Sequence, residues 1–165
     1  LPWLVLALFG GFISVHVLGI FEPIMKVHPE LFFFTPLIAA MAGNVGVQSS
    51  AIIVQGLANN TIIGPIIERL LKELSLSLLN GIILSVILLA GSYFLLGYEI
   101  HVGYTVAIAL LTVIIIASLI GTFIPILLHK NGVDPALATG PFITTSNDII
   151  GILTYFTIAK IILGI

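Results

Sequence analysis

Asp148 is the one acidic side chain in the middle of a long apolar stretch of this 165-residue chain. It lies in the segment GPFITTSNDIIGILTYF, residues 140–156. A carboxylate in a hydrocarbon layer is costly unless it faces water, a cation or a polar partner. On a helix, the side that carries the acid also carries small and hydroxyl-bearing neighbours, namely Pro141, Thr144, Thr145, Gly151 and Tyr155. The pattern indicates a wet site, with a protonated carboxyl buried against a Thr or Asn side chain as the alternative.

A second polar stripe occurs in the segment TPLIAAMAGNVGVQSSAIIVQGLA, residues 35–58. At about 100° per residue, one face of a helix here carries Asn44, Gln48, Ala51 and Gln55. The GNVG step weakens the helix at a point where freed carbonyl groups could face a cavity. Two interpretations stay open: these side chains face the stripe that carries Asp148 and line a polar path with it, or they hydrogen-bond neighbouring helices to one another.

The candidate ligands on the two stripes are all oxygen donors, which are typical of sites for hard cations. They are the carboxylate of Asp148, the amides of Asn44 and Gln48, and the hydroxyls of Thr144 and Thr145. Mg²⁺ gives up its water reluctantly and is usually held through its waters, with one or two direct carboxylates. A site between two copies of the chain would supply two Asp148 carboxylates for one divalent ion. Zero cysteines and two methionines leave little for a soft metal.

Three other titratable residues have structural interpretations that compete with functional ones. Glu73, in IERLLKELSLSLLNG at the start of a predicted helix, has Arg69 as an i, i+4 partner. Asp134, in NGVDPAL, fits a turn or a helix cap. His16, with Ser14 nearby, is typical of a hydrogen-bonded histidine between helices. The pattern alone favours structural roles for all three.

Enzymatic activity is not expected from this set of residues. An aspartic mechanism needs two carboxylates at one site, and Asp148 is the only acid in the middle of a predicted span. A serine mechanism needs a base and an orienting partner, yet the chain has no G-x-S-x-G motif and only His16 lies in the interior of a predicted span. No phosphate-binding loop for ATP-driven pumping occurs. A net charge of −2 gives no basic patch for nucleic acid.

The composition is that of an integral membrane protein. Hydrophobic residues make up 59% of the chain and charged residues 7%, with a mean hydropathy of +1.30. Charges are so sparse that the gaps between them delimit segments of the roughly 20 residues needed to cross a bilayer. The first segment lacks the basic leader of a signal peptide and is too long for its apolar core. We therefore predict an all-α polytopic bundle with five transmembrane helices at residues 3–21, 31–58, 69–97, 103–129 and 139–163.

The predicted helices form a single transmembrane domain over residues 1–165. Their connections are short and rich in Gly, Pro and Asn, and none is long enough to be a second domain. Glycines inside the predicted helices would let the helices approach closely. Basic residues are split between the two sides of the membrane, with Arg69, Lys72 and Lys130 on one and Lys26 and Lys160 on the other. The excess weakly places the first side, and the amino terminus, in the cytoplasm.

Two stretches of the chain closely resemble signature segments of the MgtE family of magnesium channels and transporters. They are PLIAAMAGNVGVQSSAIIVQGLA and VDPALATGPFITTSNDIIGILTYFTIAKIIL, in the second and fifth predicted helices. The five predicted spans match the membrane domain of that family over essentially the whole chain. The resemblance implies a homodimer in a bacterial or archaeal cell membrane that lets Mg²⁺ pass down its electrochemical gradient. The sequence does not distinguish Mg²⁺ from Mn²⁺ or Co²⁺.

The resemblance also implies which residues meet the ion. A path between the second and fifth helices of two subunits would hold a hydrated Mg²⁺ near Asp148, and Asn44 of the G-N-x-G motif would contribute to the pore. Groups near the start of the fifth helix, and the acid at the start of the third, are implied as further lining. The candidate metal-binding set from pattern and resemblance together is Asn44, Gln48, Glu73, Ala138, Gly140, Thr144 and Asp148.

The chain departs from the family layout in one respect. It shows no amino-terminal acidic domain and no paired CBS domains, the cytoplasmic parts that in the family sense magnesium and close the pore. We therefore expect the chain to be the membrane part of a longer protein. Two other functions stay open: a proton-coupled divalent cation transporter with Asp148 as the titrating group, and a non-transporting membrane scaffold whose polar stripes bind helices together.

Overall fold

The computed structural model describes residues 1–62, 64–138 and 140–164, without the side chains of Pro2, Trp3 and Ala138. These ranges contain helices and no strand. The α-helices are α1 (Pro2–Ile20), α2 (Glu22–Val27), α3 (Glu30–Ala58), α4 (Ile66–Phe94), α5 (Ile100–Lys130) and α6 (Pro141–Leu163), and a short 3-10 helix, η1 (Pro135–Ala138), precedes α6.

The five predicted segments coincide with α1, α3, α4, α5 and α6 to within a few residues at each end. The helices α3 to α6 are each long and apolar enough to cross a membrane. The apolar part of α1, Leu4–Ile20, is shorter than any of these four helices and is not counted with them. The structure therefore confirms an all-α fold with four candidate membrane spans, and a fifth span through α1 stays a prediction.

The predicted turn between the first two spans contains a helix that the sequence analysis missed. This helix, α2, has a proline in its first turn, where the missing N–H is not needed and the fixed φ suits a helix. Glu22 and Lys26 form an exposed i, i+4 ion pair of 2.8 Å along it. The hydrogen bond from Lys26, and then its charge, lower the pKa of Glu22. Proline here starts a helix instead of only ending one.

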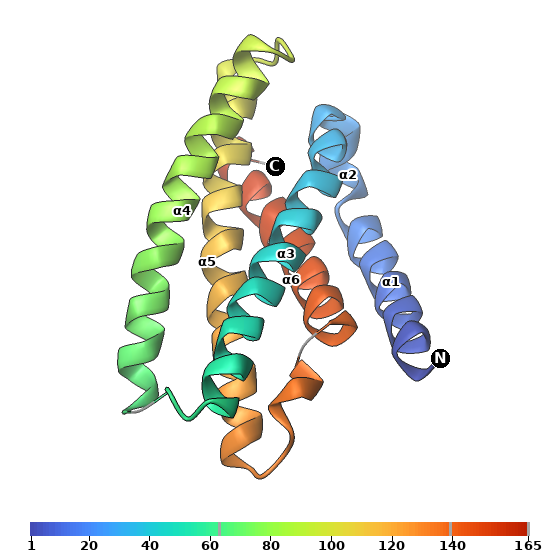
Figure 1. Cartoon of the computed structure of the whole chain (residues 1–165). Coiled ribbons are helices and arrows are strands. Elements are labelled where there is room, and N and C mark those ends of the chain that lie inside the picture. The colour runs from blue at the N-terminus through green and yellow to red at the C-terminus, as the bar shows by residue number, and fades with distance from the viewer. Residues whose placement is uncertain (63, 139, 165) are drawn as a thin grey trace.

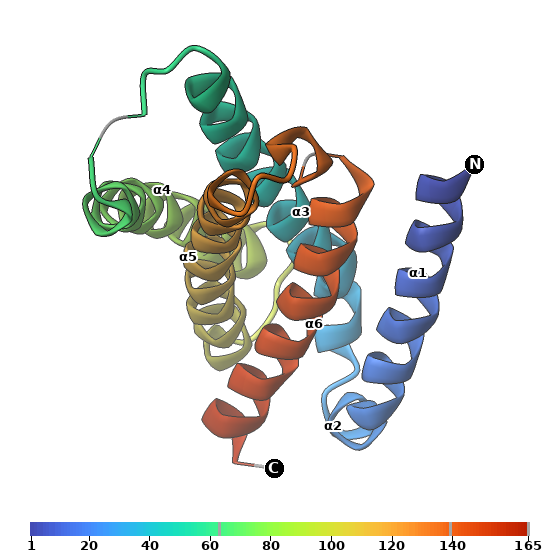
Figure 2. The ribbon, with the colours of Figure 1, turned by 90° about the horizontal axis from the view of Figure 1, so that it is seen from below.

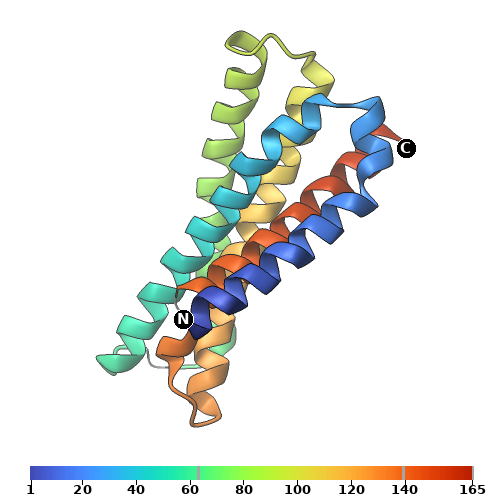
Figure 3. The same cartoon turned by 90° about the vertical axis from the view of Figure 1, so that its right-hand side faces the viewer.

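The helix α5 lies at the centre of the bundle and contacts α3, α4 and α6. Because α3 and α6 also contact each other, α3, α5 and α6 form an inner group of three helices. The helix α4 packs against α5 at one edge of this group and α1 packs against α6 at the other (Figures 1 and 2). Figure 3 shows α1 running alongside α6. Among the described residues, the two outer helices therefore leave one long side of α3 exposed.

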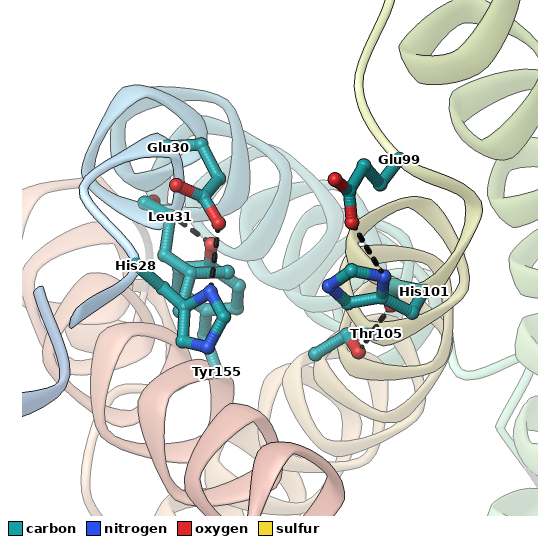
Figure 4. Close-up of polar contacts among 7 residues, drawn as sticks. All are labelled: His28, Glu30, Leu31, Glu99, His101, Thr105 and Tyr155. Carbon is teal, nitrogen blue, oxygen red and sulfur yellow. Dashed lines mark hydrogen bonds and ion pairs between the residues drawn. The ribbon is translucent and has the colours of Figure 1, made fainter.

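The inner helices bury a core of aliphatic and aromatic side chains that includes Ile38, Val106, Val113, Ile143 and Phe156. The hydroxyl of Tyr155 donates a hydrogen bond of 2.8 Å to the carbonyl of Leu31, which joins α6 to the start of α3 (Figure 4). The outward faces of α1 and α4 expose large apolar side chains such as Phe9, Phe12, Leu79, Val86 and Phe94. Such a surface suits contact with lipid and would be unfavourable in water.

Glycines bring the inner helices into backbone contact. A Cβ added at Gly121 of α5 would collide with the carbonyl group of Gly46 in α3. A Cβ added at Gly46 would collide with the amide of Asn147 in α6. Further along α6, a Cβ added at Gly151 would lie 2.8 Å from the Cβ of Ala42 in α3. The backbone of α3 is therefore held between α5 and α6 at a point where neither neighbour can tolerate extra atoms.

Two histidine–glutamate pairs lie at the opposite end of the bundle from the α3–α4 connection (Figure 4). His28 Nδ1 lies 2.8 Å from Glu30 Oε1, and His101 Nδ1 lies 3.1 Å from Glu99 Oε2. The two imidazole rings meet edge to face, with centroids 6.3 Å apart. These contacts join the α2–α3 corner to the start of α5, so this end of the inner group is tied by polar side chains.

We expect Gly121→Ala to lower the stability of the detergent-solubilised protein by about 1–3 kcal/mol, because the added methyl meets backbone atoms of α3 that cannot rotate away. Gly91→Ala in α4 is the matched control, since a Cβ there has nothing within 4 Å. The same change at Gly91 should be neutral, or stabilising by up to about 1 kcal/mol through helix propensity. Thermal unfolding measures both variants, and equal stabilities would contradict the backbone contact.

Candidate functional site

Asp148 lies in the middle of α6, where it is partly buried against α3. A Cβ added at Gly43 of α3 would lie 2.7 Å from Asp148 Oδ1 and 3.6 Å from Thr144 Cγ2. The absent side chain at Gly43 therefore makes the room that the acid occupies. Within the described residues the carboxylate has no hydrogen-bond or ion-pair partner. The alternative, a carboxyl that is hydrogen-bonded to a Thr or Asn side chain, is not found among the described residues.

The first turn of α6 is built on Gly140, whose φ of +66° is a backbone conformation that favours glycine. Its carbonyl accepts hydrogen bonds from the Thr144 backbone N–H at 3.1 Å and from Thr144 Oγ1 at 3.0 Å. Thr144 Oγ1 keeps lone pairs for a further partner, while the Gly140 carbonyl is already engaged. Ala138 ends η1, and its side chain lies outside what the structure describes.

The polar face of α3 predicted from the sequence is a continuous exposed face in the structure. It consists of Asn44, Gln48, Ala51 and Gln55, called here the α3 stripe, and all four residues are exposed. In the described part of the chain, the three amide side chains of this stripe make no hydrogen bond. The interpretation that they join helices to one another therefore has no support inside a single chain.

The two predicted stripes lie side by side and do not face each other within one subunit. The helix α6 packs on the face of α3 that carries Gly43 and Gly46. Asn44 follows Gly43 by one residue, about 100° further around the helix. The α3 stripe therefore begins next to Asp148 and turns away from α6 into the space that no helix of this chain covers.

The other side of the α3 stripe borders a groove of about 650 Å³ between α3, α4 and α5. Ser49 Oγ donates a hydrogen bond of 2.6 Å to Glu73 Oε1 across this groove, from α3 to α4. Among the described residues Glu73 forms no ion pair with Arg69, so the predicted i, i+4 partnership is not found. The polar side chains that line the groove are Asn44, Gln48, Ser49, Arg69, Glu73, Ser77, Asn80 and Ser118.

Asn147 is a polar residue of the site that the sequence analysis did not single out. It is 1% exposed, lies against Gly46, and has no hydrogen-bond partner for either amide atom in the described structure. The hydroxyl of Thr122, next to Gly121 in α5, is also buried without a partner. An unpaired buried polar group costs about 1–3 kcal/mol. The one available signal was an Asn inside an otherwise apolar helix face, one residue before the acid.

The site therefore has an exposed amide stripe with one acid at each border. Asp148 stands at the α6 border and Glu73 at the α4 border. No group of three or more His, Asp or Glu side chains positioned to hold a metal occurs within the described ranges. One chain thus offers a single carboxylate at mid-helix beside amide oxygens. A hydrated ion or a second set of ligands is needed to complete a cation site.

Comparison with known proteins agrees with this chemistry. Residues 35–158 match the family model of MgtE, described as a divalent cation transporter. The chain is 42% identical over 96% of its length to the magnesium transporter MgtE of Bacillus subtilis, and 36% identical over 97% to that of Enterococcus faecalis. It is 33% identical over 98% to the magnesium transporter MgtE of Thermus thermophilus.

The chain spans 35–36% of the length of these relatives. The matched region of the family model begins at Thr35 in α3 and ends at Ile158 in α6. It contains the α3 stripe, Glu73 and Asp148, which are the residues that the sequence patterns and the geometry both bring forward. This chain belongs to the MgtE family of divalent cation transporters.

Proposed function

We propose that the chain is the membrane part of a homodimeric Mg²⁺ channel whose ion path runs where the α3 stripes of two subunits meet. The observation that carries this proposal is the α3 stripe itself. It exposes amide side chains beside an unpartnered carboxylate, on a molecule whose other outward faces are apolar. Lipid contact at this face would be costly. A second copy placed on it would turn an exposed stripe into an enclosed polar path.

Asp148 is the main electrostatic ligand in this proposal. Two copies, one from each subunit, would hold a hydrated Mg²⁺ through its water shell, because Mg²⁺ gives up few waters. The amide oxygens of Asn44 and Gln48 would line the path next to the acid. Thr144 would offer its hydroxyl oxygen one helical turn before Asp148. The adjacency of Gly43, Thr144 and Asp148 at the α3–α6 contact supports these roles for the acid and its neighbours.

Three further residues have roles at the borders of the path. Gly140 and Ala138 would line the end of the path at the start of α6, where the backbone leaves η1. Glu73 would attract cations into the groove beside the α3 stripe, since its carboxylate lines that groove. Glu73 is partnered by Ser49, so its contribution would be to the field along the path and not to direct coordination.

In this proposal Mg²⁺ flows down its electrochemical gradient. The protein would act in the cell membrane as a transporter without enzymatic activity. The relatives named above are magnesium transporters, which supports Mg²⁺ as the ion. Mn²⁺ and Co²⁺ are candidate competitors because they take similar oxygen ligands. In the whole protein, cytoplasmic parts outside this chain would regulate the path. The rivals are proton-coupled transport, which an imposed pH gradient driving Mg²⁺ uphill would reveal, and a scaffold without flux.

Asp148→Asn is expected to reduce Mg²⁺ uptake into proteoliposomes at least tenfold. At about 4 Å and an effective dielectric of roughly 20, a unit charge attracts a unit positive charge by about 4 kcal/mol, and a divalent ion doubles this before desolvation is subtracted. If even a small fraction of this attraction remains after desolvation, it exceeds the ~1.4 kcal/mol that corresponds to a tenfold change in binding. A Mg²⁺-sensitive dye inside the vesicles measures the uptake.

Asp134→Asn is the matched control for this experiment. Asp134 is the only other aspartate of the chain, and it is exposed, with its carboxylate capping the Ala136 N–H at 2.9 Å. The same chemical change there should leave uptake intact. Wild-type flux in a well-folded Asp148→Asn protein would remove the carboxylate from the ion path. Absence of flux in the unmodified protein, with intact dimer present, would favour the scaffold.

Glu73→Gln should reduce uptake several-fold, less than the change at Asp148, because Glu73 borders the path from the groove side. A glutamine oxygen can still accept the Ser49 hydrogen bond, so the contact between α3 and α4 is kept. Ser49→Ala is the control, since it removes the hydrogen bond and keeps the charge. Equal losses in the two variants would assign Glu73 a structural role.

A single cysteine at Ala51, on the α3 stripe, should cross-link two subunits through a short bis-maleimide. The chain has no native cysteine, so the background is clean. Val86→Cys is the control, because Val86 is 59% exposed on α4 and does not line the groove beside the stripe. Denaturing electrophoresis after reaction in membranes separates monomer from dimer. Cross-linking at Val86 and not at Ala51 would place the subunit interface elsewhere.

A further inference from the structure

A basic pocket of about 250 Å³ lies at the end of the bundle where α3 ends, α4 starts and α5 ends. This end is at the bottom of Figure 1 and faces the viewer in Figure 2. The lining includes Arg69, Lys72 and Lys130, which are three of the five Lys and Arg residues of the chain. His129 lines it as well, and Glu68 is its one acidic residue. Such a cluster of basic side chains in a chain with few charged residues requires an explanation.

Arg69 is the residue that most lacks a partner in this pocket. Its Nε is buried and makes no hydrogen bond in the described structure. No ion pair within the described ranges involves Arg69, Lys72 or Lys130. A guanidinium presents a planar fork of N–H donors that matches the oxygens of a phosphate group. The buried donor therefore lacks an acceptor that an anionic ligand in the pocket would supply.

The position of these cations on α4 makes a purely structural explanation insufficient. His129 and Lys130 lie in the last turn of α5, where the helix dipole favours positive charge. Arg69 ends the first turn of α4, where the dipole disfavours positive charge, and Lys72 lies one turn further along, where the dipole has little effect. The dipole thus accounts for the α5 half of the cluster and does not account for the α4 half. An anion held between the two helices would stabilise both halves.

The start of α4 adds donors that favour the same kind of ligand. Its N-cap is Pro65, and no side chain caps the first N–H groups. Uncapped N–H groups at the start of a long helix suit an anion. Glu68 is an acid in this first turn, and it forms no side-chain hydrogen bond to the start of the helix in the described structure. Side-chain and backbone donors therefore converge from α4, and Lys130 adds a positive charge from α5.

We propose that this pocket binds the phosphate group of an anionic ligand at the membrane surface. The same end carries the excess of basic residues that predicts the cytoplasmic side, where anionic lipids make the surface negative. Basic pockets between transmembrane helices on this side are suited to phospholipid head groups. A free phosphate offers the same oxygens without an acyl chain, so the source is decided by experiment. The proposal concerns binding and is independent of the ion path.

Two double variants test the proposal at equal loss of charge. Lys72→Gln with Lys130→Gln removes two exposed cations from the pocket, and Lys26→Gln with Lys160→Gln removes two exposed cations from outside it. Native mass spectrometry of the protein in neutral detergent counts bound phosphatidylglycerol, with phosphatidylcholine as the zwitterionic comparison. Thermal unfolding in inorganic phosphate against chloride at equal ionic strength forms the second arm.

The pocket variant should bind phosphatidylglycerol roughly 25-fold more weakly than the unmodified protein, because each basic residue near an anionic lipid contributes about fivefold. The control variant should bind as the unmodified protein does. Binding of phosphatidylglycerol without stabilisation by inorganic phosphate identifies a lipid head group as the source, and stabilisation by inorganic phosphate identifies the free ion. Both results support a phosphate site.

Three results would overturn the proposal: equal loss of binding in the two double variants, equal binding of phosphatidylglycerol and phosphatidylcholine, or no effect of either phosphate source. Arg69→Lys gives an independent measurement, because it keeps the charge and removes the planar fork. It should weaken binding by several-fold, and unchanged binding would contradict the role of the guanidinium. Mg²⁺ flux is not needed for any of these readouts, so the ion path and the pocket can fail separately.

Discussion

The bundle depends on one steric constraint, which is that the backbone of α3 at Gly46 has no space on two sides. Gly121 of α5 touches its carbonyl group and Asn147 of α6 lies against its Cα. In a lipid environment, where apolar burial does not drive helices together, such contacts are a main source of cohesion. Because two faces of α3 are committed to α5 and α6, the amides on another face are left exposed. The candidate site is thus a consequence of how the core packs.

The contact of α3 with α5 and α6 also buries polar side chains inside the bundle, where an unpaired polar group is costly. Asn147 and Thr122 place unpaired polar atoms within the inner group, close to the acid on α6. Apolar side chains in their place would avoid this desolvation cost. The polar atoms nevertheless lie close to the acid, since Asn147 directly precedes Asp148 in α6. The inner helices therefore combine tight packing with polar side chains, whereas the outer faces of α1 and α4 are apolar. This division separates the polar candidate site from the apolar outer faces.

The long helices and the exposed amide stripe could be predicted from the sequence, since both follow from local patterns. Charge-free segments delimit spans, and a repeat near 3.6 residues puts Asn44 and Gln48 on one face. The relation between the stripes could not be predicted, because it depends on which glycines of α3 meet α6 across the bundle. Glu73 bonds to Ser49 in place of Arg69 for a similar reason: the nearer partner in space belongs to another helix. The short helix α2 was missed because its proline also marks turns.

The outward face of α4 has a consequence for how such a chain can change over generations. Lipid imposes an apolar character on this face but no particular shape, so exchanges among leucine, isoleucine and valine there are close to neutral. Leu79 and Val86 belong to this face. At Gly46 and Gly121 an added Cβ would collide with a neighbouring helix, so we expect selection to remove most substitutions there. We therefore expect the sequence to diverge quickly on the outward faces and very slowly at the contacts between the inner helices.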